Sequence, residues 1–193
     1  MRLTIFCLLA SLLFSSVTRA QVPVFDIKLA KSTIKFHVQA SLAIDGTFDR
    51  WHATLTFASR DVTTGVLDIK IQADSVDTGS SIKNNTLKSE DFFDVKRNPL
   101  ITFKSTKIVQ TGPDIFEVDG DLTIRGVTKG ERLTLTVFGK GTGSGEIKGT
   151  MAFDRKDYEM NASIPFIRIA DRVEVIVNLN AKRVSGPPLV FKQ

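Results

Sequence analysis

Cysteine is almost absent from this chain of 193 residues, which contains only Cys7. Cys7 lies inside the apolar run from Leu3 to Phe14, and not at its end, so it is a poor site for lipid attachment. A single cysteine cannot form a disulfide within the chain, and once residues 1–20 are removed no thiol remains for catalysis. The stability of the folded chain must therefore come from packing.

Motifs that bind metals or cofactors are also missing. His37 and His52 are the only histidines, and no HExxH or CxxC spacing occurs, so we expect no metal site. No Gly-x-Ser-x-Gly elbow is present, and the glycine-rich segment 139–146 lacks the Gly-Lys-Ser/Thr ending of a P-loop. We predict no catalytic residues and no cofactor.

An excess of one charge is missing as well. The 26 basic and 21 acidic residues give a formal net charge of +5, and the two signs are interspersed along the chain. A nucleic-acid-binding arm or a polybasic membrane patch would concentrate the positive charge. We therefore expect neither a nucleic-acid partner nor a basic membrane-binding segment.

The first twenty residues form a targeting segment. Arg2 is followed by the short apolar run and then by Thr18-Arg19-Ala20, which predicts a signal peptide cleaved after Ala20. The run is too short for an integral membrane span, and a buried N-terminal helix is the alternative. We therefore expect export across the inner membrane to the periplasm, one domain over residues 21–185 and a tail over 186–193. The tail, or an exposed sheet edge, offers a surface for a possible homodimer.

The mature sequence alternates between apolar and polar residues. Ile34, Phe36 and Val38 share one face of a strand, and about eight segments show the same period of two. Turn residues separate most of these segments. The pattern predicts an all-β fold, an extended eight-stranded antiparallel barrel, with a sandwich as the alternative.

One segment interrupts the alternation, from Ile82 to Val95. Ser89 is a good helix-capping residue, and a helix near residues 85–96 would place Glu90 and Asp91 in its first turn. Such acids stabilise a helix through its dipole, which we favour over catalysis. The alternative is a hydrolase in which Asp91 and Glu159 supply the carboxylates.

Phenylalanine dominates the aromatic residues, with 14 Phe against one Trp and one Tyr. Several lie on the apolar face of a predicted strand: Phe36, Phe57, Phe103 and Phe153. Phenyl rings carry no hydrogen-bonding group, so they could either fill a core or line an apolar cavity. Phe92 and Phe93 would then plug or rim one end of the barrel.

Six stretches resemble the YceI-like family of secreted, lipocalin-like polyisoprenoid-binding proteins. In order they are STIKFHV, GTFDRW, LKSEDFFDVKRNPLITFKST, VDGDLTIRGVTKGERLTLTV, FDRKDYEM and DRVEVIVNLNAKR. The resemblance covers about residues 25–183 and implies a lipocalin-like barrel with a short helix near one end. It also implies an apolar tunnel that holds a long isoprenoid or a similar amphiphile, and no catalytic residues.

The resemblance implies a function in binding a hydrophobic small molecule, for transport or storage in the periplasm. We predict that nine residues line the tunnel or its mouth: Phe36, Val38, Phe48, Phe57, Phe92, Phe93, Phe103, Phe153 and Tyr158. The chain departs from the family pattern at Lys31, Ala40, 84–86 and Glu159, where the family commonly has histidines or, at the last position, glycine. These departures bear on which polar head group is accepted. An outer-membrane barrel is a further alternative, which the short and charged strands disfavour.

Overall fold

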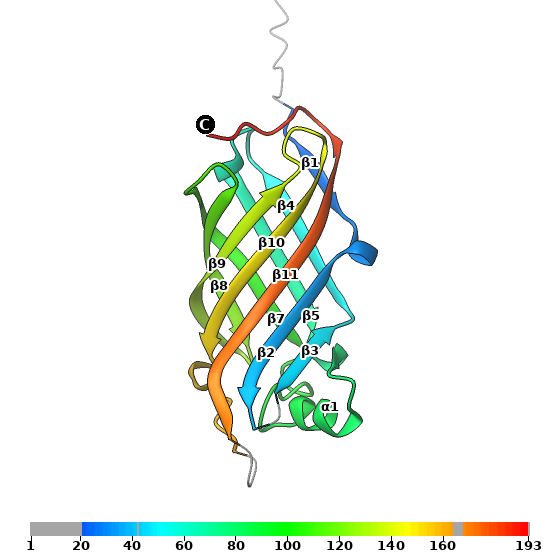
Figure 1. The fold of residues 1–193 in the computed structure, drawn as a ribbon, viewed down its shortest axis with the longest axis vertical. Coiled ribbons are helices and arrows are strands. Elements are labelled where there is room, and N and C mark those ends of the chain that lie inside the picture. The colour runs from blue at the N-terminus through cyan, green and yellow to red at the C-terminus, as the bar shows by residue number, and fades with distance from the viewer. Residues whose placement is uncertain (1–20, 42, 164–167, 193) are drawn as a thin grey trace, which may run out of the picture.

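The computed structural model describes residues 21–41, 43–163 and 168–192, so the predicted signal peptide lies outside the described residues. These residues form a tall barrel with one α-helix at one end (Figure 1). The strands are β1 (Val24–Ile27), β2 (Thr33–Ala40), β3 (Ile44–Phe48), β4 (Trp51–Phe57), β5 (Gly65–Gln72), β6 (Val76–Asp77), β7 (Leu100–Gln110), β8 (Ile115–Ile124), β9 (Val127–Phe138), β10 (Ser144–Asp154) and β11 (Ile169–Ser185). The helix α1 spans Ser81–Lys88, and short 3-10 turns span Leu29–Lys31, Val62–Thr64, Ala73–Ser75 and Arg155–Tyr158.

The strands make one antiparallel sheet that curls into a barrel. Its order is β4-β5-β7-β8-β9-β10-β11-β2-β3-β6, and β1 also pairs with β11. Only Asp49 and Arg50 separate β3 from β4, and β6 follows β5 after one short turn, so the two ends of this order belong to the same bent strands. Both β1 and β2 pair with β11, so they also follow one another along the wall. If each of the pairs β1–β2, β3–β4 and β5–β6 is counted as one bent strand, the eleven strands become eight long ones. The predicted all-β antiparallel barrel is confirmed, whereas the sheet has eleven strands, which reduce to the predicted eight only when each bent pair is counted once.

The predicted alternation matches the burial of the side chains. In β2, Ile34, Phe36 and Val38 are all buried, whereas Lys35 and Gln39 are exposed. Inward-facing side chains of an antiparallel strand alternate with solvent-facing ones, and this is the spacing that the sequence shows. The apolar core therefore lies inside the barrel.

The predicted helix is present, but its bounds near residues 85–96 were wrong. The α1 helix begins after Ser80, whose side-chain oxygen accepts a hydrogen bond from the Lys83 backbone N–H at 3.5 Å. Ser89 is the C-cap and not the N-cap, so Glu90 and Asp91 follow the helix and do not lie in its first turn. Ser80 has the same capping chemistry as Ser89, and the prediction placed the N-cap at Ser89 alone. No helix among the described residues is long and apolar enough to cross a membrane.

The C-terminal segment, residues 186–192, crosses the end of the barrel opposite α1 (Figure 1). The Val190 N–H donates to the Arg60 backbone oxygen at 2.7 Å, and the Val62 N–H donates to the Val190 oxygen at 3.2 Å. The Gln110 side chain bonds both the N–H and the backbone oxygen of Lys192, at 2.7 and 2.9 Å. The segment is thus fixed to the barrel by hydrogen bonds.

Candidate functional site

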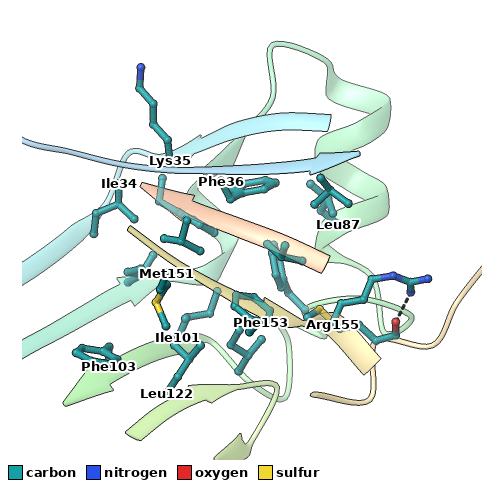
Figure 2. A pocket seen from close by; sticks show the side chains of 18 of the residues that line it. Ile34, Lys35, Phe36, Leu87, Ile101, Phe103, Leu122, Met151, Phe153 and Arg155 are labelled. Carbon is teal, nitrogen blue, oxygen red and sulfur yellow. Dashed lines mark hydrogen bonds between the residues drawn. The ribbon is translucent and has the colours of Figure 1, made fainter. Parts of the chain in front are cut away.

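A cavity of about 100 Å³ lies inside the barrel next to α1, and we name it the α1-end cavity. Apart from Lys35 and Arg155, every residue that lines it is apolar. Figure 2 shows the Lys35 side chain pointing away from this space. Seven of the nine predicted lining residues border it, namely Phe36, Val38, Phe48, Phe92, Phe93, Phe103 and Phe153.

Two of these phenyl rings lie over glycines of the neighbouring strands. Phe36 pairs with Gly46 across β2 and β3, and a Cβ added to Gly46 would overlap the Phe36 ring. A Cβ added to Gly120 would stand 2.6 Å from Cζ of Phe103. Because glycine has no Cβ, each ring can lie against the barrel wall. Both rings therefore border the α1-end cavity as well as filling the core.

An aromatic row connects the barrel wall to the segment that follows α1. The ring centroids of Phe36 and Phe48 lie 5.6 Å apart, and those of Phe48 and Phe93 lie 6.0 Å apart. The Phe93 N–H donates to the Leu87 oxygen at 3.0 Å, which folds this segment back under the barrel. Phe92 and Phe93 are both buried, so they close the α1 end of the cavity.

Asn84 fastens α1 to the barrel, a role that the sequence did not reveal. Its side-chain oxygen accepts from the Thr78 N–H at 2.8 Å, and its amide donates to an Asp77 carboxylate oxygen at 3.1 Å. The Gly79 N–H and this amide hold the pKa of Asp77 below its ordinary value. The helix is therefore positioned by polar contacts on its outer side, and the cavity side stays apolar.

The sequence analysis also did not predict the structural role of Arg155, although this residue belongs to the FDRKDYEM stretch that carries the family resemblance. Its guanidinium is buried, donates to the backbone oxygens of Met160 and Ala162, and pairs with Asp171 at 3.1 Å. The Arg155 Nε also donates to the Ala170 oxygen at 3.2 Å. Figure 2 shows this side chain beside Phe153 at the cavity wall, where its hydrogen bonds link Met160, just after the 3-10 turn, to Ala170 at the start of β11.

Tyr158 lies behind the cavity wall and lines neither of the two cavities described here. It is fully buried, packs edge-on against Phe153 with centroids 5.1 Å apart, and donates to Oε1 of Glu131 at 3.0 Å. Burial raises the pKa of the Tyr158 hydroxyl and that of the Glu131 carboxyl above their ordinary values. Tyr158 therefore supports Phe153 from outside.

A second cavity, of about 110 Å³, lies at the opposite end, and we name it the tail-end cavity. Phe57, the ninth predicted lining residue, borders this cavity and lies over Gly65 of the neighbouring strand. The C-terminal segment covers it with Leu189 and Phe191.

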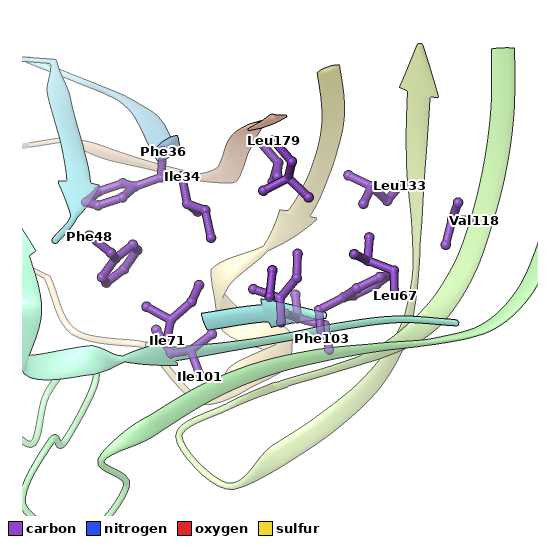
Figure 3. Packing of buried hydrophobic residues seen from close by; sticks show 14 of the residues in the cluster. Ile34, Phe36, Phe48, Leu67, Ile71, Ile101, Phe103, Val118, Leu133 and Leu179 are labelled. Carbon is purple, nitrogen blue, oxygen red and sulfur yellow. The ribbon is translucent and has the colours of Figure 1, made fainter. Parts of the chain in front are cut away.

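A layer of buried aliphatic side chains separates the two cavities, which share no lining residue. Its members come from four strands and are at most 2% exposed: Leu67, Val118, Leu133 and Leu179. We name this layer the partition, and Figure 3 shows its four members on the side of the core away from Phe36 and Phe48. The continuous tunnel implied by the resemblance is thus divided in this structure.

The carboxylates of the hydrolase alternative are both exposed. Asp91 lies in the turns after α1, and Glu159 ends the 3-10 turn at Arg155–Tyr158 with a left-handed φ of 59°. Within residues 21–41, 43–163 and 168–192, no hydrogen bond or ion pair joins them, and no three potential metal ligands cluster. Nothing in their geometry makes them an acid–base pair.

An antiparallel barrel of eight long strands with an apolar interior is typical of small-ligand-binding barrels. The chain belongs to the YceI-like domain family, whose model matches residues 25–181. It is 31% identical over 138 residues to protein YceI of Escherichia coli, covering 68% of this chain and 70% of that protein.

Two solved structures share the fold. The crystal structure of Burkholderia cenocepacia BcnA has a TM-score of 0.73 and 25% identity, covering 80% of this chain and 99% of that one. A polyisoprenoid binding domain from Saccharophagus degradans, implicated in plant cell wall breakdown, has a TM-score of 0.67 and 16% identity, covering 83% and 99%.

Proposed function

We propose that this protein binds a long-chain isoprenoid, or a similar amphiphilic lipid, with its apolar chain in the α1-end cavity. The observation that carries the proposal is the apolar lining of that cavity, closed by Phe92 and Phe93. The polyisoprenoid-binding domain of Saccharophagus degradans, which shares the fold, supports it. A polar head group would remain at the α1 end, where solvent is near.

The size of the cavity limits how such a chain is held. A dry engineered cavity of about 150 Å³ holds benzene, so about 100 Å³ accommodates only part of a long chain. Each buried methylene contributes about 0.8 kcal/mol, and association costs several kcal/mol, so tight binding needs about ten carbons or more. A long chain must therefore move the partition and extend toward the tail-end cavity.

The biological context follows from the sequence. Residues 1–20 have the features of a signal peptide, which supports export to the periplasm. A barrel that shields an apolar chain from water would carry or store a lipid there. Asp91 and Glu159, the carboxylates of the hydrolase alternative, form no hydrogen bond or ion pair with each other in the described part of the chain, which favours a carrier over the hydrolase.

Neighbouring residues of β11 provide a test. Val175 lines the α1-end cavity, whereas Ile176 is 44% exposed on the outer face of the same strand. We expect Val175→Phe to reduce binding of farnesol or of a fluorescent prenyl analogue at least about tenfold, because the ring occupies the chain's space. Ile176→Phe should bind like the unmodified protein.

Native mass spectrometry of the purified protein gives an independent measurement. We expect a co-purified lipid whose mass disappears in Val175→Phe. Equal prenyl binding by both variants, or empty spectra together with no uptake of the analogue, would contradict the proposal.

A further inference from the structure

The tail-end cavity has a cationic group at its rim. The Arg183 side chain lines the cavity, is half-buried, and donates one hydrogen bond, from Nη1 to the Gly186 backbone oxygen at 2.6 Å. No carboxylate in the described part of the chain lies within ion-pair distance of it. A guanidinium has five N–H donors, so most of its donors remain for another acceptor.

The other cation at this rim already has partners. Lys140 Nζ pairs with the Asp114 carboxylate at 2.6 Å and lies 5.1 Å from the centre of the Phe191 ring. Its charge is thus balanced by Asp114, and Lys140 helps hold the C-terminal segment. Of the two cations at this rim, Arg183 is therefore the one without a carboxylate as ion-pair partner among the described residues.

Below the rim, the cavity is apolar. Phe57, Phe116 and Leu135 are buried and line it, and the partition separates it from the α1-end cavity. Glycines 139, 141 and 143 line the mouth and place no side chain across it. A ligand chain inserted here would meet hydrocarbon at its base and the guanidinium at its mouth.

The cover of this cavity lies beyond the part of the chain that matches the family model, residues 25–181. Phe191 packs against Phe116 with ring centroids 6.1 Å apart, and Leu189 also borders the space. Arg183 and the C-terminal segment are both outside the matched region. The covering segment of the rim thus lies outside the matched region, whereas Lys140 and the glycines of the mouth lie inside it.

We propose that the tail-end cavity is a second binding site, separate from the α1-end cavity, for a short single-chain amphiphile with an anionic head group. The chain lies against Phe57, Phe116 and Leu135, and a carboxylate or phosphate monoester accepts hydrogen bonds from Arg183. Planar guanidinium donors match either anion in a bidentate arrangement. A volume of about 110 Å³ encloses only the distal part of an eight-carbon chain, so the carbons nearest the head group lie at the mouth beside Arg183.

Titration of the full chain with octanoate, octyl phosphate and 1-octanol at pH 7.5 tests this site by calorimetry. We expect one anionic ligand per chain, with 1-octanol at least about tenfold weaker, because it lacks the charge that Arg183 pairs with. Arg183→Gln should weaken both anions at least about tenfold and leave 1-octanol unchanged. Whichever anion binds more tightly identifies the head group.

Lys182→Gln is the matched control, since it removes the same charge from the exposed neighbour of Arg183. Equal weakening by both variants would reduce the effect to general electrostatics and overturn the proposal. Binding of 1-octanol as tight as that of octanoate would also overturn the proposal. This comparison needs no variant, so it remains valid even if Arg183→Gln does not fold.

A second comparison separates this site from the proposed lipid site. Val175→Phe fills the α1-end cavity, so it should abolish prenyl binding and leave octanoate binding unchanged. Loss of octanoate binding in that variant would show one shared site and overturn the inference. Failure of prenyl binding in the unmodified protein would contradict the proposed function alone.

Discussion

The phenyl ring of Phe36 lies over Gly46, the residue paired with it on the next strand. The ring occupies the position that the Cβ of any other amino acid would take. We expect Gly46→Ala to push this ring toward the α1-end cavity, lowering the free energy of unfolding by about 1–3 kcal/mol. Lipid uptake should fall as well. Urea denaturation and prenyl binding measure the two effects.

Gly130→Ala is the control for this substitution, because a Cβ at Gly130 would meet no atom within 4 Å. It should leave both stability and uptake nearly unchanged. Equal behaviour of the two variants would mean that the ring is not held against the wall by Gly46.

The partition predicts a dependence on chain length. Leu133 is 1% exposed, and Leu133→Ala should cost about 2–5 kcal/mol of stability while opening space between the two cavities. If long ligands must pass this layer, the variant should gain affinity for geranylgeraniol relative to farnesol. An unchanged ratio of the two affinities would place the bound chain elsewhere.

Glu159 adopts a left-handed backbone conformation, with φ of 59°, where non-glycine residues are strained. We expect Glu159→Gly to raise the free energy of unfolding by up to about 1 kcal/mol, measured by chemical denaturation. Glu174→Gly, in the extended strand β11, should have the opposite sign.

Glu131 predicts a pH dependence of stability. Burial raises its pKa above the ordinary value of 4.5, so the folded protein holds this proton more tightly than the unfolded chain does. The associated stability is present below pH 4.5 and is lost as the pH rises through the higher pKa of the folded state. Glutamine does not ionise, so Glu131→Gln should gain stability relative to the unmodified protein as the pH increases.

Thermal unfolding followed from pH 4 to pH 8 measures this difference. Tyr158→Phe provides a check, because it removes the hydrogen bond that lowers the Glu131 pKa and leaves the other causes in place. The pH-dependent loss should then extend to higher pH. A constant difference between Glu131→Gln and the unmodified protein at all pH values would contradict the argument.

The sequence predicted the barrel well because side-chain alternation is a local signal that every strand repeats. The helix boundary was less predictable, since Ser80 and Ser89 have the same capping chemistry and differ only in tertiary context. The partition was not predictable, because Leu133 and Leu179 alternate like any other core residue. Whether such residues meet across the interior depends on barrel register and on long-range contacts.

Tyr158 shows a similar limit for the candidate site. It lies five residues after Phe153 in the same recognisable stretch, yet its side chain turns away to bond Glu131 on β9. Arg155 was visible in that stretch, but its backbone acceptors are Met160 and Ala162 in the connection to β11 and Ala170 in β11 itself. Sequence patterns indicated which residues matter here, and the structure was needed to show what each contacts.

Both β1 and the C-terminal segment lie at the end of the barrel opposite α1 (Figure 1). A fusion partner, or a coupling group for a sensor surface, attached near either of these segments would therefore leave the helix facing outward into solution. The same arrangement would turn the α1 end, which the buried Phe92 and Phe93 close, toward solution, whereas the rim around Arg183 would face the support.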